Sequence, residues 1–191
     1  MLLLRENQKR LLNGLNPIFV LAWIYGAILF RTSLQASFPR LLQSWDILLP
    51  FAVYFGQRRP LFEGVLLTLF SSHLFSLCSS ASFGIFGFQY LFLFVVARLI
   101  SHEVYANSSV PIFTLIFLLG FVSRLTLPII ASLFGTGWDI FTWDNLNLFR
   151  LLWNSVLGFL SYWILHIVDK VTFKVPRVNI ELTSEGTFVG A

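Results

Sequence analysis

The histidines, the acidic residues and the cysteine are the side chains whose spacing could support catalysis or metal binding. A metalloprotease helix carries H-E-x-x-H, which places two histidines on one face with a glutamate as base. Here 102-HEVYA-106 begins in this way, but Ala106 stands where the second histidine belongs. Cys78 is the one cysteine, which excludes an internal disulfide and a Cys-rich metal site. The chain also has no Gly-rich phosphate loop, so the sequence predicts no metal, no cofactor and no enzymatic activity.

Five polar side chains stand inside long apolar runs: Asp46, His73, Gln89, Arg124 and Asn154. Counted along helices from the ends predicted to be cytoplasmic, they lie at depths of about 15–21 Å. An ionisable group at such a depth is costly unless it finds a partner inside the bundle. We therefore expect an internal cluster in which Arg124 pairs with Asp46 and the other three support the pair. This cluster could hold the helices together or line a ligand cavity; unrelated positions are the third interpretation.

The composition identifies the environment in which these side chains must be held. The chain has 191 residues, of which 57% are hydrophobic and only 12% charged. A soluble domain carries about 25% charged residues, so lipid must cover much of this surface. The net charge of +4 does not indicate nucleic-acid binding, because the basic residues form no stripe with interleaved aromatic residues. The sequence predicts an integral membrane protein of the all-α class.

The apolar runs set the number of membrane helices. A bilayer core of about 30 Å asks for roughly 20 apolar residues in each helix. Six runs qualify, some of them short: Leu15–Leu34, Leu42–Gly56, Leu61–Cys78, Gly84–Ile100, Val110–Phe134 and Leu148–Val168. Asp46 and Pro50 interrupt the second run, so five helices and a re-entrant segment form the alternative. We expect one transmembrane domain over 15–168, between an interfacial segment 1–14 and a mobile tail 169–191.

The orientation follows from the lysines and arginines, which gather on the cytoplasmic side of membrane proteins. With the N-terminus inside, nine of the thirteen basic residues fall on that side. These are Arg5, Lys9, Arg10, Arg58, Arg59, Arg98, Lys170, Lys174 and Arg177. The sequence therefore predicts a multi-pass protein of a bacterial inner membrane with both termini in the cytoplasm.

A charged hairpin separates the second and third runs. In 54-YFGQRRPLFEG-64, the adjacent arginines Arg58 and Arg59 are expected at the cytoplasmic face, where they could also contact a partner. Glu63 falls in the first turn of the next helix, where a carboxylate complements the helix dipole and could pair with Arg59. Small residues that allow close helix packing are expected at Ala22, Gly26, Gly64, Gly84 and Gly87.

The middle of the chain resembles the MreD family, membrane proteins of the bacterial rod-shape system. The resemblance runs from Asp46 to Ile100, about a third of the chain. Its motifs are 54-YFG-56 and 58-RRP-60 at the hairpin, then Gly64, and then 83-FGIFGFQY-90. One position departs from the family, since His73 stands near the place where an aspartate is common.

The resemblance implies a non-catalytic scaffold with five or six membrane helices. Its partners would be an MreC-type bitopic membrane protein, an MreB-type filament, RodA and penicillin-binding protein 2, and its role to support lateral peptidoglycan synthesis and cell shape. The MreD fold is similar to that of the substrate-binding S-components of energy-coupling-factor vitamin transporters. Such a vitamin-binding subunit is the alternative function, and the polar groups in the outer half of the bilayer would suit its ligand pocket.

Overall fold

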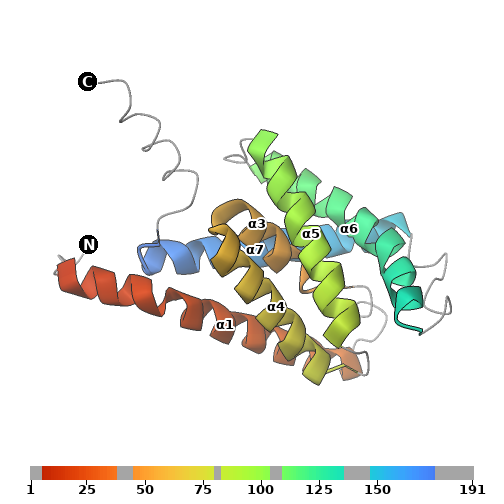
Figure 1. Ribbon diagram of the computed structural model, residues 1–191, viewed down its shortest axis with the longest axis horizontal. Helices are drawn as coiled ribbons and strands as arrows, with labels where there is room; N and C mark the ends of the chain where they lie inside the picture. Colours follow the sequence, from red (N-terminus) through yellow and green to blue (C-terminus); the bar gives the residue numbers. More distant parts are fainter. Residues whose placement is uncertain (1–5, 38–44, 80–82, 104–108, 136–146, 175–191) are drawn as a thin grey trace.

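The fold is seen in a computed structural model that describes residues 6–37, 45–79, 83–103, 109–135 and 147–174. This described part contains six α-helices and no strand, which confirms the all-α prediction. They are α1 (Glu6–Ser37), α3 (Leu49–Arg58), α4 (Leu61–Leu77), α5 (Phe83–Glu103), α6 (Ser109–Leu133) and α7 (Leu148–Val171). Figure 1 shows that they form one bundle, in which the N-terminal end of α1 and the C-terminal end of α7 lie together.

Four of these helices are long and apolar enough to cross a membrane: α1, α5, α6 and α7. Large apolar side chains point outward along them, among them Ile18, Leu118 and Trp163. Such an exterior is suited to lipid and would be unstable in water. The chain is therefore a membrane-embedded helical protein.

The second predicted span is the part that the structure corrects. We expected a helix over Leu42–Gly56, but α3 begins only at Leu49 and has 10 residues. It is about 15 Å long, half the thickness of a bilayer core. Residues Trp45–Leu48 before it are not helical. Pro50 does not interrupt α3, because it lies in the first turn, where its missing N–H has no helical partner to lose.

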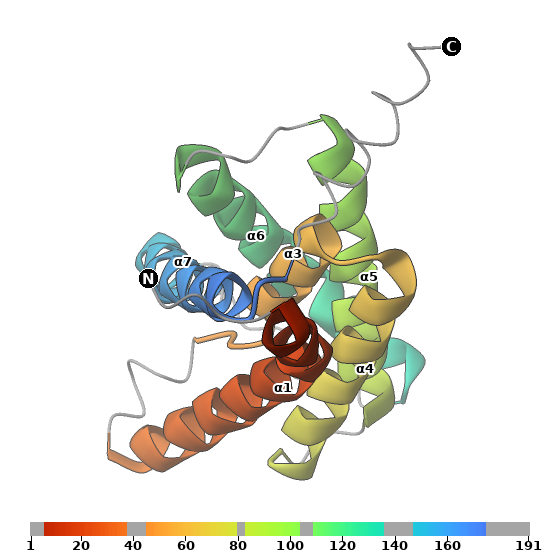
Figure 2. The same cartoon turned by 90° about the vertical axis from the view of Figure 1, so that its left-hand side faces the viewer.

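This short helix is the centre of the bundle. Every residue from Leu49 to Gln57 is buried, and Figure 2 shows the longer helices arranged around α3. Its closest neighbour is α5: a Cβ on Gly56 would lie 2.9 Å from the Phe94 carbonyl oxygen and 3.1 Å from the Ala97 Cβ. A glycine is needed here because two helix backbones approach more closely than any side chain would allow.

The small residues predicted for packing differ in what they contact. Gly64 faces the α3–α5 junction, with its missing Cβ 2.6 Å from the Phe94 ring, and Gly84 faces Phe134 in the same way at 2.7 Å. A Cβ on Gly87 would touch only Phe83 of its own helix. Gly26 has nothing within 4 Å, and Ala22 beside it is exposed, so this pair does not pack inside the bundle.

The predicted flanks also need correction. The described part of segment 1–14, from Glu6, continues into the membrane as one helix with Pro17 inside it. At the other end, α7 runs to Val171, and Asp169 is only 7% exposed. The packed domain therefore extends past the predicted boundary at 168, while residues 175–191 of the predicted tail lie outside the described part.

Candidate functional site

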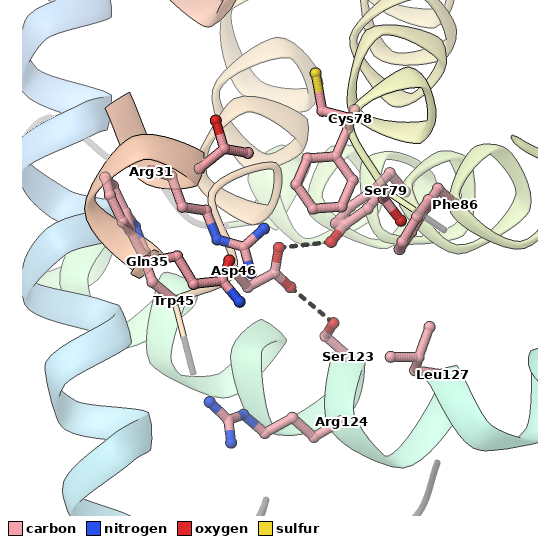
Figure 3. A pocket seen from close by; sticks show the side chains of 13 residues that line it. Arg31, Gln35, Trp45, Asp46, Cys78, Ser79, Phe86, Ser123, Arg124 and Leu127 are labelled. Atoms are coloured by element: carbon pink, nitrogen blue, oxygen red, sulfur yellow. Dashed lines mark hydrogen bonds between the residues drawn. The ribbon is translucent and has the colours of Figure 1, made fainter. Parts of the chain in front are cut away.

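Asp46 occupies the break in the backbone just before α3. Its Oδ1 accepts hydrogen bonds from the Tyr90 hydroxyl at 2.6 Å and from the Leu49 N–H at 3.2 Å. Its Oδ2 accepts from the Ser123 hydroxyl at 3.1 Å. Figure 3 shows the two hydroxyl bonds as dashed lines from α5 and α6. The carboxylate therefore joins three helices, and its position at the start of α3 is favoured by the helix dipole.

Asn154 holds the backbone of the same residue. Its side-chain oxygen accepts the Asp46 N–H at 2.9 Å, and Asn154 is itself buried on α7. Irregular backbone at membrane depth is tolerated only where protein or a water-filled cavity satisfies its polar groups. Asn154 meets this requirement, and the prediction that it supports Asp46 agrees with the structure.

Gln89 is connected to Asp46 through Ser123. It donates to the Ser123 carbonyl at 3.1 Å and to the Thr126 hydroxyl at 2.9 Å, both on α6. It also donates to the Ser123 hydroxyl at 3.2 Å, and since that hydroxyl in turn donates to Asp46, a hydrogen-bonded chain links Gln89 to the carboxylate. The sequence indicated Gln89 and Asn154 as polar members of the cluster, whereas Tyr90 entered only as the last residue of the motif 83-FGIFGFQY-90 and Ser123 was not selected.

His73 is not part of this cluster. Its side chain is exposed on α4, where the ring lies edge-on to Phe83 with centroids 5.4 Å apart. Depth in the membrane alone does not say which face of a helix a residue occupies. The expected contribution of His73 to the cluster is therefore wrong.

A cavity of about 420 Å³ adjoins Asp46. Arg31 of α1 and Arg124 of α6 both line it, so Arg124 and Asp46, the two residues predicted to pair, border the same cavity, and no ion pair joins these two described residues. The aromatic residues Trp45, Phe75 and Phe86 supply apolar surface. A volume of roughly 300–1,000 Å³ with a few convergent polar groups is characteristic of ligand pockets.

A second polar centre lies at the opposite end of α3, where Asp169 of α7 collects three side chains. It accepts hydrogen bonds from the Arg59 guanidinium and the Tyr54 hydroxyl, and its Oδ1 also accepts from the Asn16 amide at 2.8 Å. Arg59 is fully buried. Asp169 thus connects α1, α3 and α7 through one carboxylate.

The network reaches the surface through Glu63. Its two oxygens accept from Arg59 at 3.0 Å and from Lys174 at 2.9 Å. The predicted Arg59–Glu63 pair is therefore present. However, Arg59 is fully buried and paired with two carboxylates of its own chain, so it is not an exposed partner contact. Arg58 is half-buried and donates to the Tyr162 hydroxyl at 3.4 Å.

The sequence interpretation missed Asp169, Asn16 and Tyr162 as members of this network. A signal was present on α7, because Tyr162, Leu165 and Asp169 recur at spacings of three and four on one buried helical face. We placed Asp169 in the tail since it follows the last apolar run. A charged residue on the stripe that faces the core would have indicated a buried partner instead.

Comparison of the chain with protein-family models, curated proteins and solved structures finds no match. Among the described residues, no group of three or more histidine, cysteine or acidic side chains is placed to hold a metal ion. The two polar centres and the sequence resemblance are therefore the features from which a function can be inferred.

Proposed function

We propose that the chain is a non-catalytic scaffold of the bacterial elongation machinery, as its resemblance to MreD implies. It would sit in the inner membrane with both termini cytoplasmic and work with an MreC-type bitopic protein, an MreB-type filament, RodA and penicillin-binding protein 2. In that role it supports lateral peptidoglycan synthesis and therefore cell shape.

The observation that carries this proposal is where the resembling residues meet. Tyr54, Arg59 and Gly64 are separate letters of the hairpin motif, yet they converge on the same end of the bundle. Tyr54 and Arg59 bind Asp169, and Gly64 allows α4 to lie against Phe94. The residues of the motif thus hold one end of the bundle together, which we call the locked end. A scaffold needs such a rigid surface to position its partners.

The groups left for a partner lie around this locked end. Lys174, Glu63 and Arg58 are only partly buried, and Leu61 and Phe62 are exposed at 55% and 76%. An exposed apolar pair beside mixed charges at a membrane surface is suited to a second helix with a polar end. We therefore place the partner contact at the start of α4 and remove Arg59 from it.

Co-purification tests the scaffold. A tagged chain expressed in a rod-shaped host that lacks its own copy should retain the MreC-type partner in mild detergent and restore rod shape. Phe62→Glu should reduce both results without lowering the amount of protein in the membrane, and Val110→Glu, at the equally exposed start of α6, is the matched control. Full recovery of shape and partner with Phe62→Glu would reject this contact, and failure of the wild-type chain to retain any elongation protein would reject the scaffold.

The cavity favours a second function, the vitamin-binding subunit of an energy-coupling-factor transporter. It lies at the end of the bundle that is predicted to face the outside, as the capture of a vitamin from the exterior requires. Mass spectrometry of the purified chain for a copurified vitamin, and of its complexes for a shared ATPase module, tests this alternative. A gene position beside the filament and bitopic-partner genes would instead support the scaffold.

A further inference from the structure

The unmatched polar atoms of the cavity are hydrogen-bond donors. Trp45 is only 7% exposed, and its indole Nε1 is buried without a hydrogen-bond partner among the described residues. The Nε atom of Arg31 is buried without a partner as well. Both residues line the cavity. A buried donor left unmatched costs free energy, and an acceptor bound in the cavity would satisfy two donors that the described part of the bundle leaves unmatched.

The acidic side chain of the cavity does not meet this need. Asp46 already accepts three hydrogen bonds, from Tyr90, Ser123 and the Leu49 N–H, which fix both of its oxygens to the bundle. Arg31 brings a positive charge to the lining, and neither its Nε nor the Trp45 Nε1 has a hydrogen-bond partner in the described part of the chain. These free donors therefore favour an anion.

The rest of the lining selects for the body of the ligand. The Arg31 guanidinium carbon lies 5.1 Å above the Phe75 ring, which holds this cation in place by a cation–π contact. Phe86 and Leu127 extend the apolar wall beyond it. Figure 3 shows Arg31 and Asp46 on the same side of the cavity as Gln35, with Phe86 and Leu127 on the other side. A ligand would place a charged group against the arginine and an apolar group against these rings.

We propose that this cavity binds an oxyanion attached to an apolar body, with Arg31 and the Trp45 indole N–H as its donors. A guanidinium matches the geometry of a carboxylate or a phosphate, and an indole N–H adds one directed bond. Two sources carry this chemistry: a small carboxylic acid that enters from the outer side, or the phosphate of an anionic lipid. The inference goes beyond the scaffold and does not depend on it.

The test uses the purified full chain in phosphatidylcholine nanodiscs with 3-phenylpropionate as the probe. Ligand-observed NMR should show binding of this carboxylate, and its neutral amide should bind about ten-fold more weakly, because one charged hydrogen bond is lost. Arg31→Gln and Trp45→Phe should each lower the affinity for the probe by about ten-fold. Arg150→Gln removes an arginine outside the cavity lining and should leave binding unchanged. Thermal unfolding of each variant checks the fold, and Trp45→Phe keeps the test valid if Arg31→Gln does not fold.

The lipid arm distinguishes the two sources. If the phosphate of a lipid is the natural oxyanion, native mass spectrometry should find phosphatidylglycerol retained by the wild-type chain and lost from Arg31→Gln and Trp45→Phe. Phosphatidylglycerol in the nanodisc should then displace the probe. If the source is a small acid, the probe should bind equally well in both lipids.

Three results would overturn the site. One is that neither the probe nor phosphatidylglycerol binds, which would leave a cavity filled by water. Another is that the amide binds as tightly as the carboxylate. The third is that Arg150→Gln weakens binding as much as Arg31→Gln, since a general effect of positive charge would then explain the result. None of these outcomes bears on whether the chain assembles with elongation proteins.

Discussion

The two ends of α3 solve the same problem in opposite ways. Each end has an aspartate inside a membrane protein, where an isolated charge is costly. Asp169 meets a fully buried arginine, a tyrosine and an asparagine, and the network closes on itself. Asp46 meets hydroxyl and amide donors instead, and its arginines line an open volume. The comparison shows that a buried carboxylate can have two roles. When it is ion-paired with a buried arginine it holds helices together, and when it is not it can form part of a binding site.

Neutralising each aspartate is the strongest way to break this comparison. Asp169→Asn leaves Arg59 buried with a single remaining carboxylate, so we expect a loss of about 3–5 kcal/mol in the free energy of unfolding. Asp46→Asn keeps an oxygen that accepts from Tyr90, and its amide N–H can donate to the Ser123 hydroxyl, so the change should cost only about 1–2 kcal/mol. Circular dichroism during unfolding of both variants in detergent measures the difference between their free energies of unfolding. Equal losses would show that the two ends are not distinct.

Adding one methyl group at each end sharpens the comparison for packing. Gly64→Ala forces a Cβ against the Phe94 ring, which is fully buried and cannot move aside, so a cost of about 1–3 kcal/mol is expected. Gly84→Ala meets the Phe134 ring, which is 47% exposed and free to rotate away. Its stability should stay close to that of the wild type.

The same measurement separates two interpretations of Gly64. A small residue also allows a partner helix to approach, and in that case a bulky residue would weaken assembly with the partner while insertion stays intact. The structure assigns Gly64 to contacts within the bundle, so a bulky residue should unfold the isolated chain. Wild-type stability of Gly64→Leu together with loss of a partner would restore the first interpretation.

Removing the tyrosine hydroxyl that donates to each aspartate tests whether water can reach that end of α3. Tyr54→Phe deletes a buried donor to Asp169 that nothing else can replace, and we expect a loss of about 1–3 kcal/mol. Tyr90→Phe deletes a donor to Asp46, but water from the adjoining cavity can take its place, so the loss should be smaller. Thermal unfolding of the pair measures both. A larger loss at Tyr90 would mean that the cavity excludes water.

The smallest effect is expected at the surface of the closed network. Lys174→Gln breaks the ion pair with Glu63, in which both side chains are about one-fifth exposed, and leaves the Arg59–Glu63 pair in place. Partly exposed pairs contribute at most about 1 kcal/mol and weaken as salt screens them. The difference from wild type should therefore shrink in concentrated salt. A salt-independent loss would show that Lys174 stabilises the chain by more than this ion pair.

Most helix positions could be read from local pattern. The predicted run Leu61–Cys78 and α4 agree to one residue, and Val110–Phe134 and α6 agree equally well. These limits are set by proline, glycine and the end of apolar residues, which act over a few positions. The exception is the second run. Its apolar composition suited a span, but Asp46, held by Asn154 and Tyr90, fixes a break that only distant residues can stabilise.

The candidate site was only half accessible from the sequence. Asp46, Gln89, Arg124 and Asn154 were selected because polar residues inside apolar runs must serve some purpose. His73 met the same criterion and is exposed, because the face that a helix presents depends on its neighbours. Tyr90 and Trp45 were passed over, since an aromatic residue in an apolar helix gives no sign that its polar atom is used.

The sequence by itself determined that this is a helical membrane protein, where its long helices lie, and that charge gathers at the hairpin after α3. These properties depend on composition and on neighbours within a turn or two. The tertiary structure alone decided which polar groups meet: Arg59 and Asp169 are 110 positions apart, and Asp46 and Asn154 are 108 apart. It also decided that one aspartate is sealed by a cation and the other faces a cavity. The physical reason is that pairing inside a membrane is set by how helices pack, and packing is a property of surfaces that no single segment contains.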